Sequence, residues 1–268
     1  MGLSEIDAES MELIPGASSA LYGPNAFNGV LLMTSKSPFD YQGLSAQGKF
    51  GFTTSDAQDN EMFPTYTFNV RYAKAFNDKF AFKVNFCYMK AEDWYGTDYR
   101  TDTNRPEYEG DLTGQPNFDG LNLYGDDTRI LIPLDNILGV PSGTYGTLDV
   151  RRTGWQEEIL LDNREAKSIK GDIALHYRIN DKVEALYNYR YGGGSSVYQG
   201  SQKYALRDFT QQFHKAEIRA DNFFVRGYVT ATDAGDSYNV GALGGYINEY
   251  ISTTKTEWAP TYATNYYL

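Results

Sequence analysis

The sequence predicts an all-β fold, built as an antiparallel up-and-down meander, from its composition, its alternation and its turns. Among its 268 residues are 23 Tyr and 15 Phe. Aromatic and β-branched residues favour strands over helices. A chain of this length can bury a substantial core in one or two domains. The composition therefore predicts a sheet-based protein.

Apolar and polar residues alternate along the chain with a period of two, which indicates strands. From Phe80 to Tyr88 the even positions are apolar, whereas Lys83 and Asn85 occupy odd positions. The pattern recurs in the runs 66–76, 169–179 and 183–191, and more weakly in 208–219 and 223–232. Each run has about the 9 to 11 residues with which a tilted strand crosses a bilayer. We therefore expect the even positions from Phe80 to Tyr88 to face lipid, and Lys83 and Asn85 to face the lumen or plug.

Short segments rich in Asn and Asp, at 77–79, 180–182 and 220–222, separate pairs of runs. Both residue types tolerate the positive φ of tight hairpins. The longer segments 55–62, 92–165 and 192–207 fall between the remaining pairs. All tight turns then lie at one end of the sheet, a parity typical of outer-membrane barrels and unexplained by a soluble sandwich. The sequence therefore predicts about seven strands of a larger transmembrane β-barrel.

The predicted long loop 92–165 concentrates the negative charge of the chain. It has 16 acidic residues and 6 arginines but no lysine, and the whole chain has a net charge of -11. Such a loop repels nucleic acid, which we exclude as a partner. Its aromatic residues are candidates for stacking on a sugar or binding a cation. The ligand-binding candidates are Trp94, Tyr95, Tyr99 and Trp155. The alternative is a loop that packs on itself and is solvated.

A second long loop, 233–268, contains apolar residues at helical spacing between Val240 and Ile251. Ser237 or Asn239 could cap this short helix. Its apolar stripe favours packing against neighbouring loops over binding a ligand.

The sequence has no pattern typical of an enzyme or a metal site. It lacks a nucleophile elbow, a phosphate-binding loop and a zinc-protease motif. Cys87 stands alone, and His176 and His214 lie in strand-like runs, where we expect ordinary wall residues. Asn117, Asp119 and Asp126–Asp127 match no defined calcium loop. We expect no catalysis, no metal and no cofactor.

The stretch ELIPGASSALYGPNAFNGVLLMTSKSP, residues 12–38, resembles the C-terminal end of the plug domain of TonB-dependent outer-membrane receptors. The residues that carry the resemblance include Gly16, Leu21, Tyr22, Gly23, Asn25 and Gly29. Pro15-Gly16-Ala17 stands where the family has Arg-Gly-Pro. The segment around Phe224 is similar to barrels of the Bacteroidota branch. Glycines at these positions allow close turns of a plug chain inside a barrel.

The resemblance implies a domain organisation and a function. Residues 1–40 would be the C-terminal part of a plug and 41–268 the N-terminal part of a barrel, so we expect an internal fragment. The parent would import a scarce siderophore, glycan or peptide through the outer membrane of a Gram-negative bacterium. Its partners would be outer-membrane lipid and a TonB-type energy-coupling protein, which would act on a region preceding this chain. A surface lipoprotein is a further candidate partner. The alternatives are a passive porin or adhesin barrel and, third, a barrel-borne hydrolase.

Overall fold

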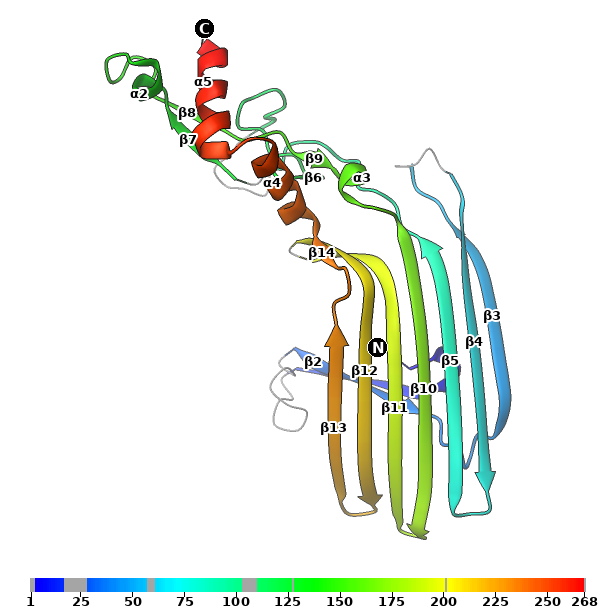
Figure 1. The fold of residues 1–268 in the computed structure, drawn as a ribbon. Helices are drawn as coiled ribbons and strands as arrows, with labels where there is room; N and C mark the ends of the chain where they lie inside the picture. Colours follow the sequence, from blue (N-terminus) through cyan, green and yellow to red (C-terminus); the bar gives the residue numbers. More distant parts are fainter. Residues whose placement is uncertain are drawn as a thin grey trace.

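One large antiparallel sheet dominates the computed structural model, which describes residues 3–16, 28–56, 61–102, 110–126, 128–200 and 202–267. In this part of the chain, the long strands follow one another across the sheet in chain order (Figure 1). They are β3 (Gly43–Thr53), β4 (Phe63–Phe76), β5 (Phe80–Glu92), β10 (Glu165–Asn180), β11 (Val183–Gln199), β12 (Lys203–Ala220) and β13 (Phe224–Asp233). All neighbouring pairs are antiparallel. The predicted all-β antiparallel meander is confirmed.

Tight turns join β4 to β5, β10 to β11 and β12 to β13 at one end of the sheet (Figure 1). Asn77 has a φ of 54°, in the left-handed region that Asn tolerates better than most residues. In the next turn, the Lys182 amide donates to Asn180 Oδ1 at 2.9 Å. The predicted turn positions are therefore confirmed.

The prediction of a long loop over 192–207 is wrong. β11 and β12 continue through this segment and pair as far as Gln199 and Lys203. A bulge between Gly194 and Ser196 interrupts the register. A Cβ atom at Gly194 would lie 1.9 Å from the carbonyl oxygen of Lys167. Glycine is needed here because two strands approach closely, not because the chain leaves the sheet.

The two faces of the sheet have opposite polarity. On β5, Val84 and Phe86 are 38% and 43% exposed, whereas Lys83 and Asn85 are 3% and 4% exposed. Neighbouring strands repeat this arrangement. Their exposed apolar residues include Phe68, Tyr72, Ile173, Leu175 and Tyr177, and their buried polar residues include Asn69, Arg71, His176 and Asn188. The alternation correctly sorted the residues into two faces, and the buried face is the polar one.

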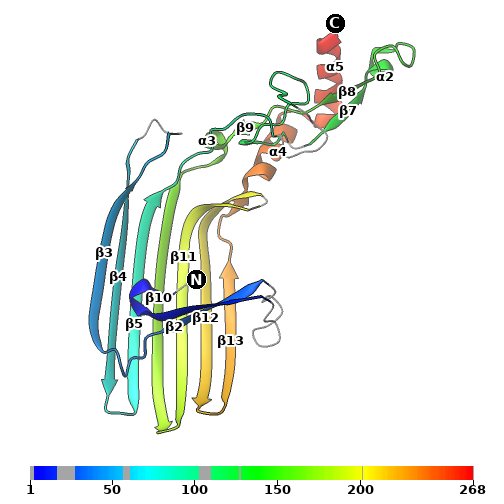
Figure 2. The same ribbon diagram turned by 180° about the vertical axis from the view of Figure 1, so that it is seen from behind.

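The N-terminal segment crosses the polar face of the sheet (Figure 2). It consists of a 3-10 turn, η1 (Glu5–Asp7), followed by a hairpin of β1 (Ala8–Pro15) and β2 (Gly29–Ser35). At Gly29 φ is 144°, and a Cβ atom would lie 2.9 Å from the carbonyl oxygen of Ile14. Gly16, directly after the end of β1, has a φ of 85°. The other motif residues, Leu21, Tyr22, Gly23 and Asn25, lie outside the described residues.

The long loops fold together beyond the other end of the sheet (Figure 1). Their elements are β6 (Leu123–Tyr124), β7 (Ile130–Pro133), α2 (Leu134–Leu138), β8 (Thr147–Val150), β9 (Trp155–Gln156), α3 (Glu157–Leu160), β14 (Tyr238–Asn239), α4 (Val240–Ile251), the π-helical turn η3 (Thr254–Trp258) and α5 (Ala259–Tyr267). β6 pairs with β9, β7 with β8, and β14 with β12. Two small cores hold them, one around Ile132 and Val150 and one around Leu160 and Val240.

The helix predicted between Val240 and Ile251 is confirmed as α4. Asn239 is its N-cap, since its side chain accepts a hydrogen bond of 2.9 Å from the Ala242 amide. Ser237 instead accepts from the Arg207 amide. In the described part of the chain, no helix is both long and apolar enough to cross a membrane.

Candidate functional site

A buried ion cluster joins the N-terminal segment to the sheet. Asp7 of η1 is fully buried and faces Arg71 of β4 and Lys83 of β5. Its carboxylate accepts from Arg71 Nε at 2.8 Å and from Lys83 Nζ at 2.9 Å. Two cations thus share one carboxylate in a site that excludes water. We call Asp7, Arg71, Lys83, Ser35 and Lys36 the polar junction.

The polar junction also fixes β2 and the connection to β3. Ser35 Oγ donates to Asp7 Oδ2 at 2.8 Å, and Lys83 Nζ donates to the carbonyl oxygen of Lys36 at 2.8 Å. Arg71 Nη1 donates to the carbonyl oxygen of Tyr41 at 2.8 Å. These contacts are hydrogen bonds and ion pairs, so separating the segment from the sheet would require rehydration of charges more than exposure of apolar surface.

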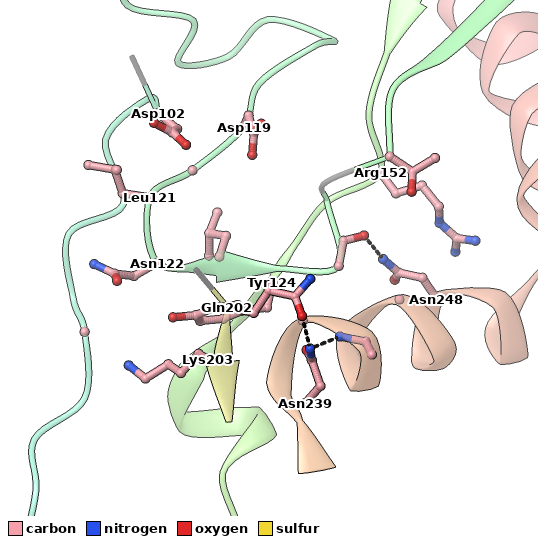
Figure 3. A pocket seen from close by; sticks show the side chains of 18 of the residues that line it. Asp102, Asp119, Leu121, Asn122, Tyr124, Arg152, Gln202, Lys203, Asn239 and Asn248 are labelled. Atoms are coloured by element: carbon pink, nitrogen blue, oxygen red, sulfur yellow. Dashed lines mark hydrogen bonds between the residues drawn. The ribbon is translucent and has the colours of Figure 1, made fainter. Parts of the chain in front are cut away.

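A wide pocket, which we call the loop pocket, opens among the long loops and the ends of β11 and β12 (Figure 3). Its volume is about 1260 Å³. Side chains come from the 93–124 segment, from the β11–β12 turn and from α4. Three regions distant in sequence therefore contribute to one cavity.

Asn248 of α4 holds one wall of the pocket in place. It accepts from Trp155 Nε1 at 2.9 Å and donates to the carbonyl oxygen of Gly125 at 3.0 Å. A Cβ atom at Gly244 would lie 2.4 Å from the carbonyl oxygen of Tyr124. The helix packs on β6 this closely because position 244 has no side chain.

Four charged side chains that line the pocket bond to other groups of the protein. Asp119 lies 3.3 Å from Arg151 Nη1, and Lys203 forms an ion pair with Glu157. Arg152 donates to the carbonyl oxygen of Ser252 at 2.6 Å, and its burial lowers its pKa from the usual value. Hydrogen bonding by Thr254 lowers the pKa of Glu249, which stays ionised at neutral pH.

The candidate aromatic residues have different positions. Trp94 is 54% exposed and lines the pocket. Tyr95 packs against the Leu160 core, with the Arg164 guanidinium 5.0 Å from its ring centroid. Trp155 supports Asn248, and Tyr99 is half-buried and does not line the pocket. The structure therefore brings only Trp94 of the four to the pocket surface.

The sequence reasoning missed the polar pocket residues, among them Asn122, Gln199 and Gln202, and the exposed Tyr246 of α4. No motif marks such residues, because amide side chains are common on any loop. The sequence predicts the helix that contains Tyr246, because its pattern is local. It does not predict which loop α4 packs against.

The described residues contain no group of three His, Cys, Asp or Glu side chains arranged to hold a metal. Asp126 accepts from the Gly120 amide at 3.2 Å and so supports the loop backbone, while Asp127 lies outside the described residues. His176 lies 2.6 Å from Glu184, and His214 lies 2.9 Å from the Tyr187 hydroxyl. Both histidines are on long strands, as wall residues would be.

Comparisons with known proteins give no family for this chain: no protein-family model matches it, and no curated protein matches it either.

Proposed function

We propose that this chain is part of a TonB-dependent outer-membrane receptor, comprising the end of its plug and the first strands of its barrel. The observation that carries the proposal is the polarity of the sheet, whose exposed face is apolar and whose covered face is polar. The described parts of the motif, residues 12–16 and 28–38, belong to the N-terminal segment that crosses the polar face.

The exposed face requires an apolar surrounding. Burying a large apolar side chain contributes about 1.5–3 kcal/mol, so a water-soluble sheet turns such residues to its core. Here Phe68, Tyr72 and Phe86 are 49%, 40% and 43% exposed. Alternating strands with apolar residues outside and polar residues inside are typical of membrane barrels. Outer-membrane lipid would then be the partner of the exposed face.

The N-terminal segment fits the role of a movable plug element. Its contact with the wall includes the polar junction. A TonB-type coupling protein, acting on a region that precedes this chain, would pull on this segment. The hairpin could leave the wall without exposing a large apolar surface. We propose transport of a siderophore, glycan or peptide, and no catalysis.

The topology can be tested with single cysteines in the full-length protein carrying Cys87→Ser. A cysteine at Asp111, in the long loops, should react with an impermeant thiol reagent on intact cells. A cysteine at Asp181, in the β10–β11 turn, should react only after the outer membrane is opened. Labelling of position 181 on intact cells, or of neither position after opening, would contradict the proposal.

Energy coupling separates a receptor from a passive porin or adhesin. Uptake of the ligand by cells should stop when the inner-membrane proton gradient is dissipated, whereas its binding to the surface should remain. Uptake that continues at the same rate without the gradient would favour the porin.

A further inference from the structure

We propose that the loop pocket binds a neutral oligosaccharide, with Trp94 and Tyr246 as stacking surfaces and Asn122, Gln199 and Gln202 as partners for hydroxyl groups. The inference rests on the proposed function in one respect only, the location of the pocket on the outside of the cell.

The two aromatic rings are available to a ligand. Trp94 and Tyr246 are 54% and 74% exposed, and both line the pocket. They approach it from the 93–124 segment and from α4. Exposed indole and phenol rings combine an apolar face with a polar edge. The C–H face of a sugar ring can cover such a ring while its hydroxyl groups point to the rim.

Several amide groups in the pocket have capacity for further hydrogen bonds. Asn122 donates from Nδ2 to the carbonyl oxygen of Asp98 at 3.0 Å, which leaves its Oδ1 open among the described residues. Gln202 accepts at Oε1 from Asn239 and Tyr204, which leaves Nε2 open there. Gln199 uses only Nε2, for a long contact of 3.4 Å. An amide offers both donors and acceptors, as hydroxyl groups require.

Four of the charged side chains that line the pocket already bond to groups of the protein itself. Asp119 and Lys203 are already paired with Arg151 and Glu157. Arg152 and Glu249 bond to the 252–254 backbone. A charged ligand would have to compete with these internal partners, whereas a neutral polar ligand uses the open amides and rings.

The size of the pocket favours a chain of sugars over a single one. Pockets for drug-sized ligands have volumes of about 300–1,000 Å³. The loop pocket has a volume of about 1260 Å³. It therefore has room for an oligosaccharide.

The test is calorimetric titration of the full-length protein, purified from outer membranes, with defined probes. The neutral probes are maltohexaose, cellohexaose and xylohexaose, and the charged probes are a trilysine peptide and ferric enterobactin. At least one hexasaccharide should bind. Trp94→Ala should weaken it at least about fivefold, which corresponds to the energy of an aromatic contact. Trp94→Phe should recover most of the loss, and Gln202→Ala should weaken binding as well.

Tyr145→Ala is the matched control. Tyr145 is 51% exposed in the β7–β8 hairpin and does not line the pocket. Its substitution should leave affinity within about twofold. The inference is overturned if no hexasaccharide binds at about 10 mM. It is also overturned if Trp94→Ala and Tyr145→Ala have equal effects, or if only a charged probe binds. Correct cysteine labelling without oligosaccharide binding would refute this inference alone, whereas binding with inverted labelling would refute the proposed function and the outside location of the pocket, but not its ligand.

Discussion

The indole N–H of Trp155 donates a 2.9 Å hydrogen bond to Asn248 Oδ1, across 93 positions of the chain. This contact joins the first long loop to α4, which belongs to the second. Neither loop would be ordered in this way alone, because both contribute residues to the small core around Leu160 and Val240, together with Val197 of β11 and Ala205 of β12.

Gly244→Ala should detach α4 from β6. The added Cβ atom would lie 2.4 Å from the Tyr124 carbonyl oxygen, whereas at Gly245 nothing lies within 4 Å. Gly245→Ala is therefore the control, and it should stabilise the helix by about 0.5–1 kcal/mol. Amide exchange in α4 should accelerate only in Gly244→Ala. Equal exchange in the two variants would contradict the packing described.

Asp7→Ala should release the N-terminal segment from the sheet. It leaves Arg71 and Lys83 buried without a carboxylate, a change that costs about 3–5 kcal/mol. Limited proteolysis of the 3–16 segment should become faster. Glu12→Ala, which removes an exposed carboxylate of β1, should have no effect. The added substitution Lys83→Met should restore part of the resistance, and its failure to do so would mean that Lys83 and Asp7 are not coupled.

Val84→Arg should be far more damaging than Leu131→Arg, although both residues are exposed, at 38% and 56%. Val84 lies on the apolar face of β5 and Leu131 in the β7–β8 hairpin. At the centre of a bilayer, Arg on the lipid face costs about 2–4 kcal/mol, whereas an ordinary surface change costs about 0.5 kcal/mol or less. The free energy of unfolding in lipid vesicles measures the difference. Two equally small values would mean that water covers this face.

The β7–β8 hairpin should loosen in acid. Hydrogen bonds from the Tyr145, Gly143 and Gly146 amides, at 2.7, 2.6 and 3.2 Å, lower the pKa of Asp135. The lowered pKa means that the ionised form stabilises the hairpin. This contribution is complete above about pH 4, the unfolded value, and is lost as the pH falls through the lower folded value. Protection of the Tyr145 amide should therefore fall as the pH drops below about 4 and through the lower folded pKa of Asp135.

Asp135→Asn is the control for this titration. It should show weak protection of the Tyr145 amide at every pH, because no ionisable acceptor remains. A variant with the same acid response as the original protein would assign the response to another carboxylate.

The strands, the turns and α4 were predictable because their signals are local. Alternation from Phe80 to Tyr88 and the Asn-Asp turns depend on a few neighbouring residues. The continuation of β11 and β12 was not predictable, because three consecutive glycines at 192–194 are typical of a loop. Only the structure shows that Gly194 lies close to the backbone of Lys167.

The polar junction and the loop pocket depend on long-range contacts. Asp7 meets Arg71 and Lys83 across 64 and 76 positions. The aromatic residues of the first loop identified the right region, yet Trp155 forms an internal support while Trp94 faces the pocket. Sequence alone does not distinguish these two roles, because both are tryptophans in the same acidic loop.

The length of the two-stranded β11–β12 ribbon determines how far its tip would extend from a membrane. Its strands have 17 and 18 residues. If about 9 to 11 residues of each strand crossed a bilayer, roughly 20 Å of ribbon would remain outside the hydrocarbon. Lys203, Gln202 and Gln199, at the tip of this ribbon, line the loop pocket. In an outer membrane the ribbon would act as a stalk, so an incoming molecule would first meet the protein well above the lipid headgroups.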